Sequence, residues 1–81
     1  MMETRVIEQM IETGIPGAKA TVSGDGSHFD AIVVSDAFIG KSLLQQQRMV
    51  YATLGDKITS GELHALSIKS YTCSQWSAQS A

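Results

Sequence analysis

The chain is poor in the residues that build self-contained disulfide or metal sites. Its 81 residues include one cysteine, Cys73, which excludes an internal disulfide and a thiolate metal site made by this chain alone. Any cluster or metal site would therefore need ligands from a partner. The chain also lacks the run of about 20 apolar residues that a membrane helix needs, and its first residues lack the apolar core of a signal peptide. These absences predict a cytoplasmic protein with no membrane contact.

The chain also has no large excess of positive or negative charge. The formal net charge is −2, whereas general nucleic-acid binders usually carry a strong basic excess that neutralises phosphates. Hydrophobic residues make up 43% of the chain and charged residues 17%, which is typical of a folded globular protein. The length is sufficient for one small domain, which we place at residues 1–81.

Hydrophobic periodicity predicts an alternation of helices and strands. A long helix is expected to begin at Ser42 as N-cap, with Gln45 at the capping-box position, and to carry an apolar stripe that Gln47 interrupts. The stripe is Leu43, Val50, Leu54 and Ile58. In chain order we expect a helix at 3–13, strands at 18–22 and 28–34, a connection at 36–41 with a short helix, the long helix at 43–58, a strand at 62–71, and a short last helix that includes Trp76.

These elements favour an α+β fold with one small three-stranded sheet and helices packed on one face. The two early strands are separated by Gly-Asp-Gly-Ser at positions 24–27, a turn signal that predicts a hairpin. The last helix has its own capping pair, Thr72 and Gln75.

Four segments in this order resemble the BolA-like family. The compact turn at 24–27 is similar to that of its short-loop bacterial branch, called IbaG-like. The segments are Ser-His-Phe at 27–29, Val-Val-Ser-Asp-Ala-Phe-Ile-Gly-Lys-Ser at 33–42, Arg-Met-Val-Tyr-Ala-Thr-Leu at 48–54, and Leu-His-Ala-Leu-Ser-Ile-Lys-Ser-Tyr-Thr at 63–72 with Trp76.

The resemblance implies a class II KH-like fold and an adaptor role. Members bind a monothiol glutaredoxin, and the two proteins hold a bridging two-iron two-sulfur cluster together with glutathione. The resemblance also implies a monomer alone, a heterodimer with the partner, no cofactor when alone, and a place in iron homeostasis or the stress response. No arrangement of residues typical of an enzyme is present, so we expect no catalysis.

Three residues are candidate cluster ligands. His64 matches the family's ligand histidine in the Leu-His-Ala-Leu segment. The second family ligand is a cysteine or histidine in the loop between the first two strands, where this chain has Asp25, with His28 as the nearest imidazole. Read from the residues alone, His64 is a strand histidine with a structural role, His28 a hydrogen-bonded residue beside the turn, and Asp25 a turn residue whose oxygen donors suit an iron–sulfur centre poorly.

Lys41, Arg48 and Lys57 are the candidate nucleic-acid contacts. They lie in or near the long helix, and together with Asp36 and Asp56 they leave that stretch only weakly basic. The alternative function is therefore a DNA- or RNA-binding regulator that uses the helix-turn-helix surface at 36–58, although solvated helix charges are the default interpretation.

Cys73 stands near the start of the last predicted helix, where a helix N-terminus can lower a thiol pKa. The family commonly has proline at this position, which favours an incidental cysteine.

Overall fold

The computed structural model describes residues 3–61, 63 and 65–80, and these form four α-helices, one short 3₁₀ helix and three strands. Their order is the predicted one. In chain order they are α1 (Thr4–Gly14), β1 (Lys19–Gly24), β2 (Phe29–Val34), the 3₁₀ helix η1 (Asp36–Phe38), α2 (Leu43–Thr53), α3 (Gly55–Thr59), β3 (Leu66–Tyr71) and α4 (Cys73–Ser80).

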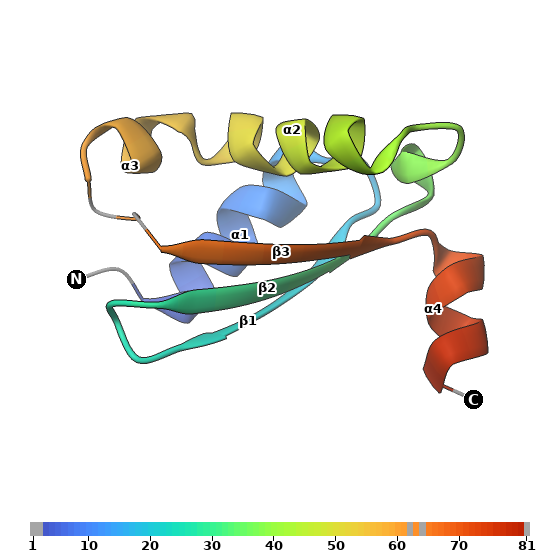
Figure 1. Ribbon diagram of the computed structural model, residues 1–81, viewed down its shortest axis with the longest axis horizontal. Coiled ribbons are helices and arrows are strands. Elements are labelled where there is room, and N and C mark those ends of the chain that lie inside the picture. The colour runs from blue at the N-terminus through green and yellow to red at the C-terminus, as the bar shows by residue number, and fades with distance from the viewer. Residues whose placement is uncertain (1–2, 62, 64, 81) are drawn as a thin grey trace.

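The sheet has the order β1-β2-β3, with β2 in the centre. β1 and β2 form the antiparallel hairpin that the turn predicts, with Thr21 opposite Ile32. β3 runs parallel to β2, with Lys69 opposite Ile32. The return between these parallel strands carries η1, α2 and α3, as a parallel crossover requires. In Figure 1, α2 runs along one side of the sheet above β3, α1 crosses behind the strands, and α4 stands at the far end of β3.

The core lies between the sheet and the helices α1 and α2. Alternate residues of the strands point into it, which is the period-two pattern of a sheet covered on one face. Its buried apolar members are Ile7, Ile11, Ile15, Ala20, Val22, Phe29, Ala31, Val33, Phe38, Val50, Leu54 and Leu63.

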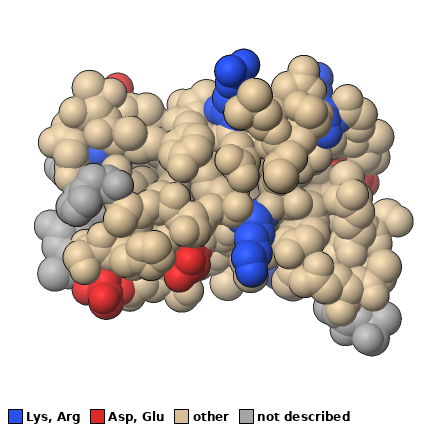
Figure 2. Space-filling view, in the orientation of Figure 1, with Lys and Arg blue, Asp and Glu red and all other residues tan. Residues whose placement is uncertain are grey.

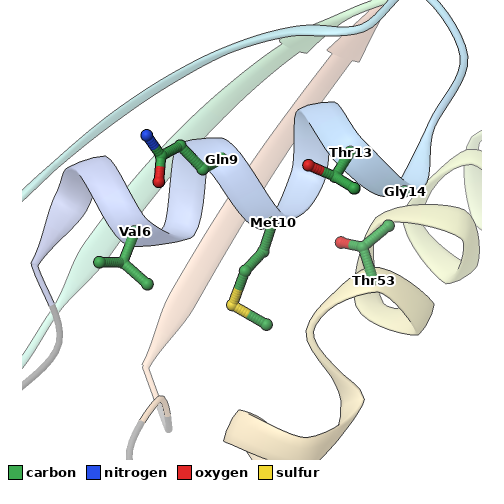
Figure 3. A pocket seen from close by; sticks show the side chains of 6 residues that line it. All are labelled: Val6, Gln9, Met10, Thr13, Gly14 and Thr53. Atoms are coloured by element: carbon green, nitrogen blue, oxygen red, sulfur yellow. The ribbon is translucent and has the colours of Figure 1, made fainter.

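Helix α1 packs closely against the end of α2. A Cβ atom added at Gly14 would collide with the Thr53 side chain, so the absence of a side chain at Gly14 lets the two helices meet (Figure 3). Of the apolar residues of α1, Ile7 and Ile11 are fully buried and Met10 is half-buried, while Val6 lies at the exposed rim.

The predicted long helix is broken, and the prediction of its buried apolar stripe was partly wrong. The chain leaves the helical conformation at Leu54 and restarts at Gly55 as α3. The Thr53 hydroxyl donates to the Val50 carbonyl at 2.7 Å, a bond that commonly bends helices. Leu43 is 62% exposed because α2 begins beyond the edge of the core, whereas the buried polar residue of this helix is Gln46.

Both predicted capping boxes are present. The Ser42 amide donates to the Gln45 side chain at 2.8 Å and the Gln45 amide donates to the Ser42 hydroxyl at 3.1 Å. Thr72 and Gln75 repeat this exchange at 2.9 and 3.2 Å. The second box starts α4 directly after β3. The third strand begins later than predicted, at Leu66.

Candidate functional site

The strands β2 and β3 begin at the same end of the sheet, and this end carries His28. The Phe29 amide donates to the Ala65 carbonyl at 2.8 Å. His28, directly before β2, therefore lies next to Ala65, directly before β3. The parallel register thus joins two segments that are 37 residues apart in the sequence.

Asp25 is committed to the turn that precedes this site. Its Oδ1 accepts hydrogen bonds from the Ser27 amide at 3.0 Å, from the Ser27 hydroxyl at 3.0 Å and from the His28 amide at 2.9 Å. The bond from the His28 amide, and then those from Ser27, lower the pKa of Asp25 from its ordinary 3.8 to about 2. The structure therefore gives Asp25 a turn-forming role, as its residue type favours.

His28 presents an accessible imidazole. Its side chain is 56% exposed, and its Nε2 atom lies 3.5 Å from Oδ1 of Asp30 on β2. A carboxylate beside an imidazole commonly orients a metal-binding histidine. His28 is the one imidazole among the described residues.

His64 lies outside the described residues. Its neighbours in the chain are well fixed: the amide of buried Leu63 donates to the Lys57 carbonyl at 3.1 Å, and Ala65 is held by Phe29. The ligand role of His64 stays a prediction that rests on the family resemblance.

The donor set of the described residues fits an iron–sulfur cluster only as part of a larger ligand set. Across residues 3–61, 63 and 65–80, no group of three or more His, Cys, Asp and Glu side chains is placed to hold a metal ion. A two-iron cluster takes four ligands, with imidazole able to replace thiolate. His28 suits that chemistry, and the hydrogen-bonded oxygens of Asp25 do not.

The three candidate basic residues do not form one cluster. Lys41, in the loop after η1, and Arg48, on α2, are exposed, whereas Lys57 in α3 is half-buried. Arg48 lies on α2 and Lys57 on α3, on either side of the break at Leu54. Figure 2 shows basic side chains separated by uncharged surface, so the structure does not gather these residues into one basic patch.

A hollow of about 390 Å³ lies between α1 and the end of α2. In Figure 3, Met10 and Val6 point from α1 into this space, and Thr53 faces them from the other helix. Its lining is Val6, Gln9, Met10, Thr13, Gly14 and Thr53, so it contains no ionisable side chain that could carry acid–base chemistry.

The loop before α2 and the first turn of α2 expose apolar side chains whose exposure the sequence did not predict. Ile39, Leu43 and Leu44 are each about 60% exposed. The only available signal was the doublet Leu43–Leu44 after the N-cap, since one amphipathic stripe cannot bury two adjacent residues equally.

In the part of the chain that the structure describes, none of the helices combines the length and apolar character needed to cross a bilayer.

Comparisons with known proteins agree with the fold. A family model described as BolA-like protein matches residues 6–75. The "Acid stress protein IbaG" of Escherichia coli K12 is 39% identical over 75 residues, which cover 93% of this chain and 89% of that protein. The "DNA-binding transcriptional regulator BolA" of the same organism is 39% identical over 54 residues, covering 67% of this chain and 50% of that protein.

Among solved structures, a BolA protein homologue from Coxiella burnetii matches with a TM-score of 0.85 and 40% identity, over 95% of this chain and 99% of that chain. Its fold is the same small α+β fold, and the match extends across the sheet and its covering helices.

Proposed function

Because this chain belongs to the BolA-like family, we propose that it is an iron–sulfur adaptor and not an enzyme. It binds a monothiol glutaredoxin and supplies histidine ligation to a bridging two-iron two-sulfur cluster that glutaredoxin and glutathione also hold. The adaptor acts in the cytoplasm, alone as a monomer and with glutaredoxin as a heterodimer, in cluster trafficking or in the response to iron and stress.

The observation that carries the proposal is the exposed His28 beside Ala65, at the end of the sheet where β2 and β3 begin. In the Leu-His-Ala-Leu segment, His64 is the residue just before Ala65. We assign His64 the ligand role that the family resemblance implies, with His28 as the candidate second ligand. Histidine in place of thiolate raises the reduction potential of a bound cluster.

The test uses a cluster reconstituted on a monothiol glutaredoxin with glutathione. On adding this protein, the visible circular dichroism spectrum should change and a one-to-one complex should form. His64→Ala should restore the spectrum of the glutaredoxin alone, and His28→Ala should alter the spectrum if His28 is the second ligand. Asp25→Asn is the matched control and should leave the spectrum unchanged, because the Asp25 carboxylate is engaged in the turn.

An unchanged spectrum with wild-type protein, together with the absence of a complex, would refute the adaptor function. If His64→Ala gives the same spectrum as the wild-type complex, only the assignment of His64 as ligand is refuted. The first result therefore tests binding to the glutaredoxin, and the second tests the identity of the ligand.

A second candidate function is nucleic-acid binding, since one relative is named a DNA-binding transcriptional regulator. Exposed Lys41 and Arg48 would contact phosphates, and the dispersed charge implies few such contacts. Each contact adds about 0.9 to the slope of log affinity against log salt on duplex DNA. We expect a slope no steeper than about 3, reduced by Lys41→Ala and Arg48→Ala.

A further inference from the structure

The two edge strands of the sheet, β1 and β3, differ in whether side chains bond to their outward backbone groups. On β1, the Val22 amide donates to Oε2 of Glu8 at 2.8 Å, and the Ala20 amide donates to Oε2 of Glu12 at 3.0 Å. Both carboxylates come from α1, so side chains occupy the backbone donors of this edge. Covering an edge in this way prevents another strand from pairing with it.

The β3 edge lacks this cover. The Ala65 and Tyr71 carbonyls accept from the amides of Phe29 and Ser35 in or next to β2. Because a parallel ladder uses alternate residues on each side, the residues between them turn their N–H and C=O groups outward. These residues are Leu66, Ile68 and Ser70.

Among the described residues, only one side chain reaches this outward row of backbone groups. The Tyr51 hydroxyl lies 3.4 Å from the Leu66 carbonyl oxygen, at an exposed position. No described group accepts from the amides of Leu66, Ile68 or Ser70. The row is short, but it presents donors and acceptors at the spacing of a strand.

A stripe of α2 runs beside this row. Leu43, Gln47 and Tyr51 are four residues apart and share one side of the helix. Tyr51 reaches the start of β3, and Gln46 bonds to Ser70 near its end, so the stripe follows the strand in the opposite direction. Figure 1 shows α2 lying along β3 in this way. Leu43 is 62% and Tyr51 39% exposed, which leaves apolar surface beside the edge.

The charge on these two elements has one sign. α2 contains Arg48 and β3 contains Lys69, and neither element contains an acidic residue. Both basic side chains are exposed, although the chain as a whole has a net charge of −2. In Figure 2 the acidic side chains in the foreground lie toward the hairpin end of β1 and β2, one of them close to the basic side chain in the middle of the view, and further basic side chains lie over α2.

We propose that the β3 edge surface binds an extended acidic segment of a protein partner by strand addition. The β3 edge surface comprises the outward backbone of Leu66, Ile68 and Ser70, the α2 stripe and the two basic residues. Main-chain hydrogen bonds supply affinity in this mode, and alternate side chains supply specificity. Apolar residues of the segment cover Leu43 and Tyr51 on the α2 side. Its acidic residues alternate with these and face Lys69 on the open face of the sheet, and Arg48 adds positive charge nearby.

The charge argues against a second copy of this chain as the occupant. Pairing two β3 edges would bring two basic strands flanked by two basic helices together, and like charges across an interface disfavour association. The proposal goes beyond the cluster function and does not depend on it, because no cluster ligand belongs to the β3 edge surface.

The test uses fluorescein-labelled heptapeptides that alternate glutamate with valine, isoleucine, leucine or phenylalanine. At physiological salt, at least one should bind and slow amide exchange at Leu66, Ile68 and Ser70. N-methylation of one alternate set of peptide amides should abolish binding, whereas N-methylation of the other set should leave it intact, because successive amides of a strand point to opposite sides. Arg48→Glu with Lys69→Glu should weaken binding about tenfold or more, since like charges then face each other.

Lys19→Glu is the matched control, because Lys19 is an exposed basic residue on the covered strand β1. This variant should bind like the wild type. Strand addition is overturned if binding is unaffected by N-methylation of either set of amides. It is also overturned if no peptide binds at a concentration of about 1 mM, which would detect even weak binding. Preferential binding of oligothymidine at the same amides assigns the surface to nucleic acid instead.

Discussion

The side chain of Gln46 accepts a hydrogen bond from the Ser70 hydroxyl at 2.6 Å and so joins α2 to the edge strand β3. Its amide nitrogen donates to the carbonyls of Lys41 and Phe38 at 3.0 and 3.3 Å. One buried side chain therefore holds the loop after η1, the start of α2 and the end of β3 together. Every polar atom of a buried amide needs such partners, because leaving one unpaired is costly.

We predict that Gln46→Ala destabilises the protein by about 1–3 kcal/mol, the usual cost of leaving buried partners unsatisfied. The affected groups are the Ser70 hydroxyl and the two loop carbonyls. Urea denaturation followed by circular dichroism measures the change. Gln47→Ala, at the half-buried neighbouring position, is the control and should change stability by less than about 0.5 kcal/mol. Equal losses in the two variants would contradict the linking role of Gln46.

The sequence predicted the elements well because their signals are local. Capping pairs such as Ser42 with Gln45 depend on a three-residue spacing and were confirmed. The burial of Gln46 could not be predicted, since its partner Ser70 is 24 residues away and periodicity treats any glutamine as a polar residue. The exposure of Leu43 also depends on where the helix starts relative to the core.

The candidate site was predictable only in part. The turn role of Asp25 follows from its residue type and was confirmed. The neighbourhood of His28 and Ala65 depends on the parallel register of two distant strands, which sequence periodicity does not give. The pairing of Glu8 with the Val22 amide is likewise tertiary, because the helix pattern says only that Glu8 flanks the apolar stripe. His64 stays a prediction that rests on the family resemblance.

The carboxylates of Glu8 and Glu12 should protect the β1 edge. In Glu8→Ala with Glu12→Ala, we expect faster amide exchange at Val22 and Ala20, because each amide loses its acceptor. The double alanine variant should lose about 1–3 kcal/mol of folding stability, because it loses two hydrogen bonds to charged groups and water replaces them only in part.

Glutamine at both positions is the matched control, since it keeps an acceptor oxygen. Exchange in the glutamine variant should remain closer to that of the wild type. If alanine and glutamine variants exchange alike, the carboxylates do not protect the edge.

Asp36 should suppress the reactivity of Cys73. The Asp36 side chain accepts a hydrogen bond from the thiol, and this bond, with smaller contributions from desolvation and the Asp36 charge, raises the pKa of Cys73. A helix start can lower the pKa of a thiol, but the Asp36 carboxylate at the start of α4 outweighs that effect at Cys73. Its Oδ1 also accepts from the Cys73 amide at 3.1 Å.

We predict that Asp36→Asn lowers the pKa of Cys73 and speeds its alkylation by iodoacetamide at pH 8, where more thiolate is then present. The pH dependence of the alkylation rate measures the shift. Asp30→Asn, at an exposed carboxylate on β2, is the control and should leave the rate unchanged. An unchanged or slower rate in Asp36→Asn would show that the Asp36 carboxylate does not suppress the thiol.

The turn at Asp25 should make stability depend on acid. The pKa of Asp25 falls from 3.8 to about 2 because backbone amides, first that of His28, donate to its carboxylate. A carboxyl group with a depressed folded-state pKa stabilises the fold above its unfolded pKa and loses that contribution as pH falls through the folded value. The contribution of Asp25 should therefore be complete above about pH 5 and disappear progressively toward pH 2.

Asp25→Asn removes this titration, so the stability difference between the variant and the wild type should shrink as the pH is lowered from 5 to 2. Urea denaturation at several pH values gives that difference directly. Ser23→Ala, at an exposed position next to the turn on β1, is the control and should differ from the wild type by the same amount at each pH. A difference between Asp25→Asn and the wild type that stays constant with pH would mean that the carboxylate carries no charge-dependent bond in the turn.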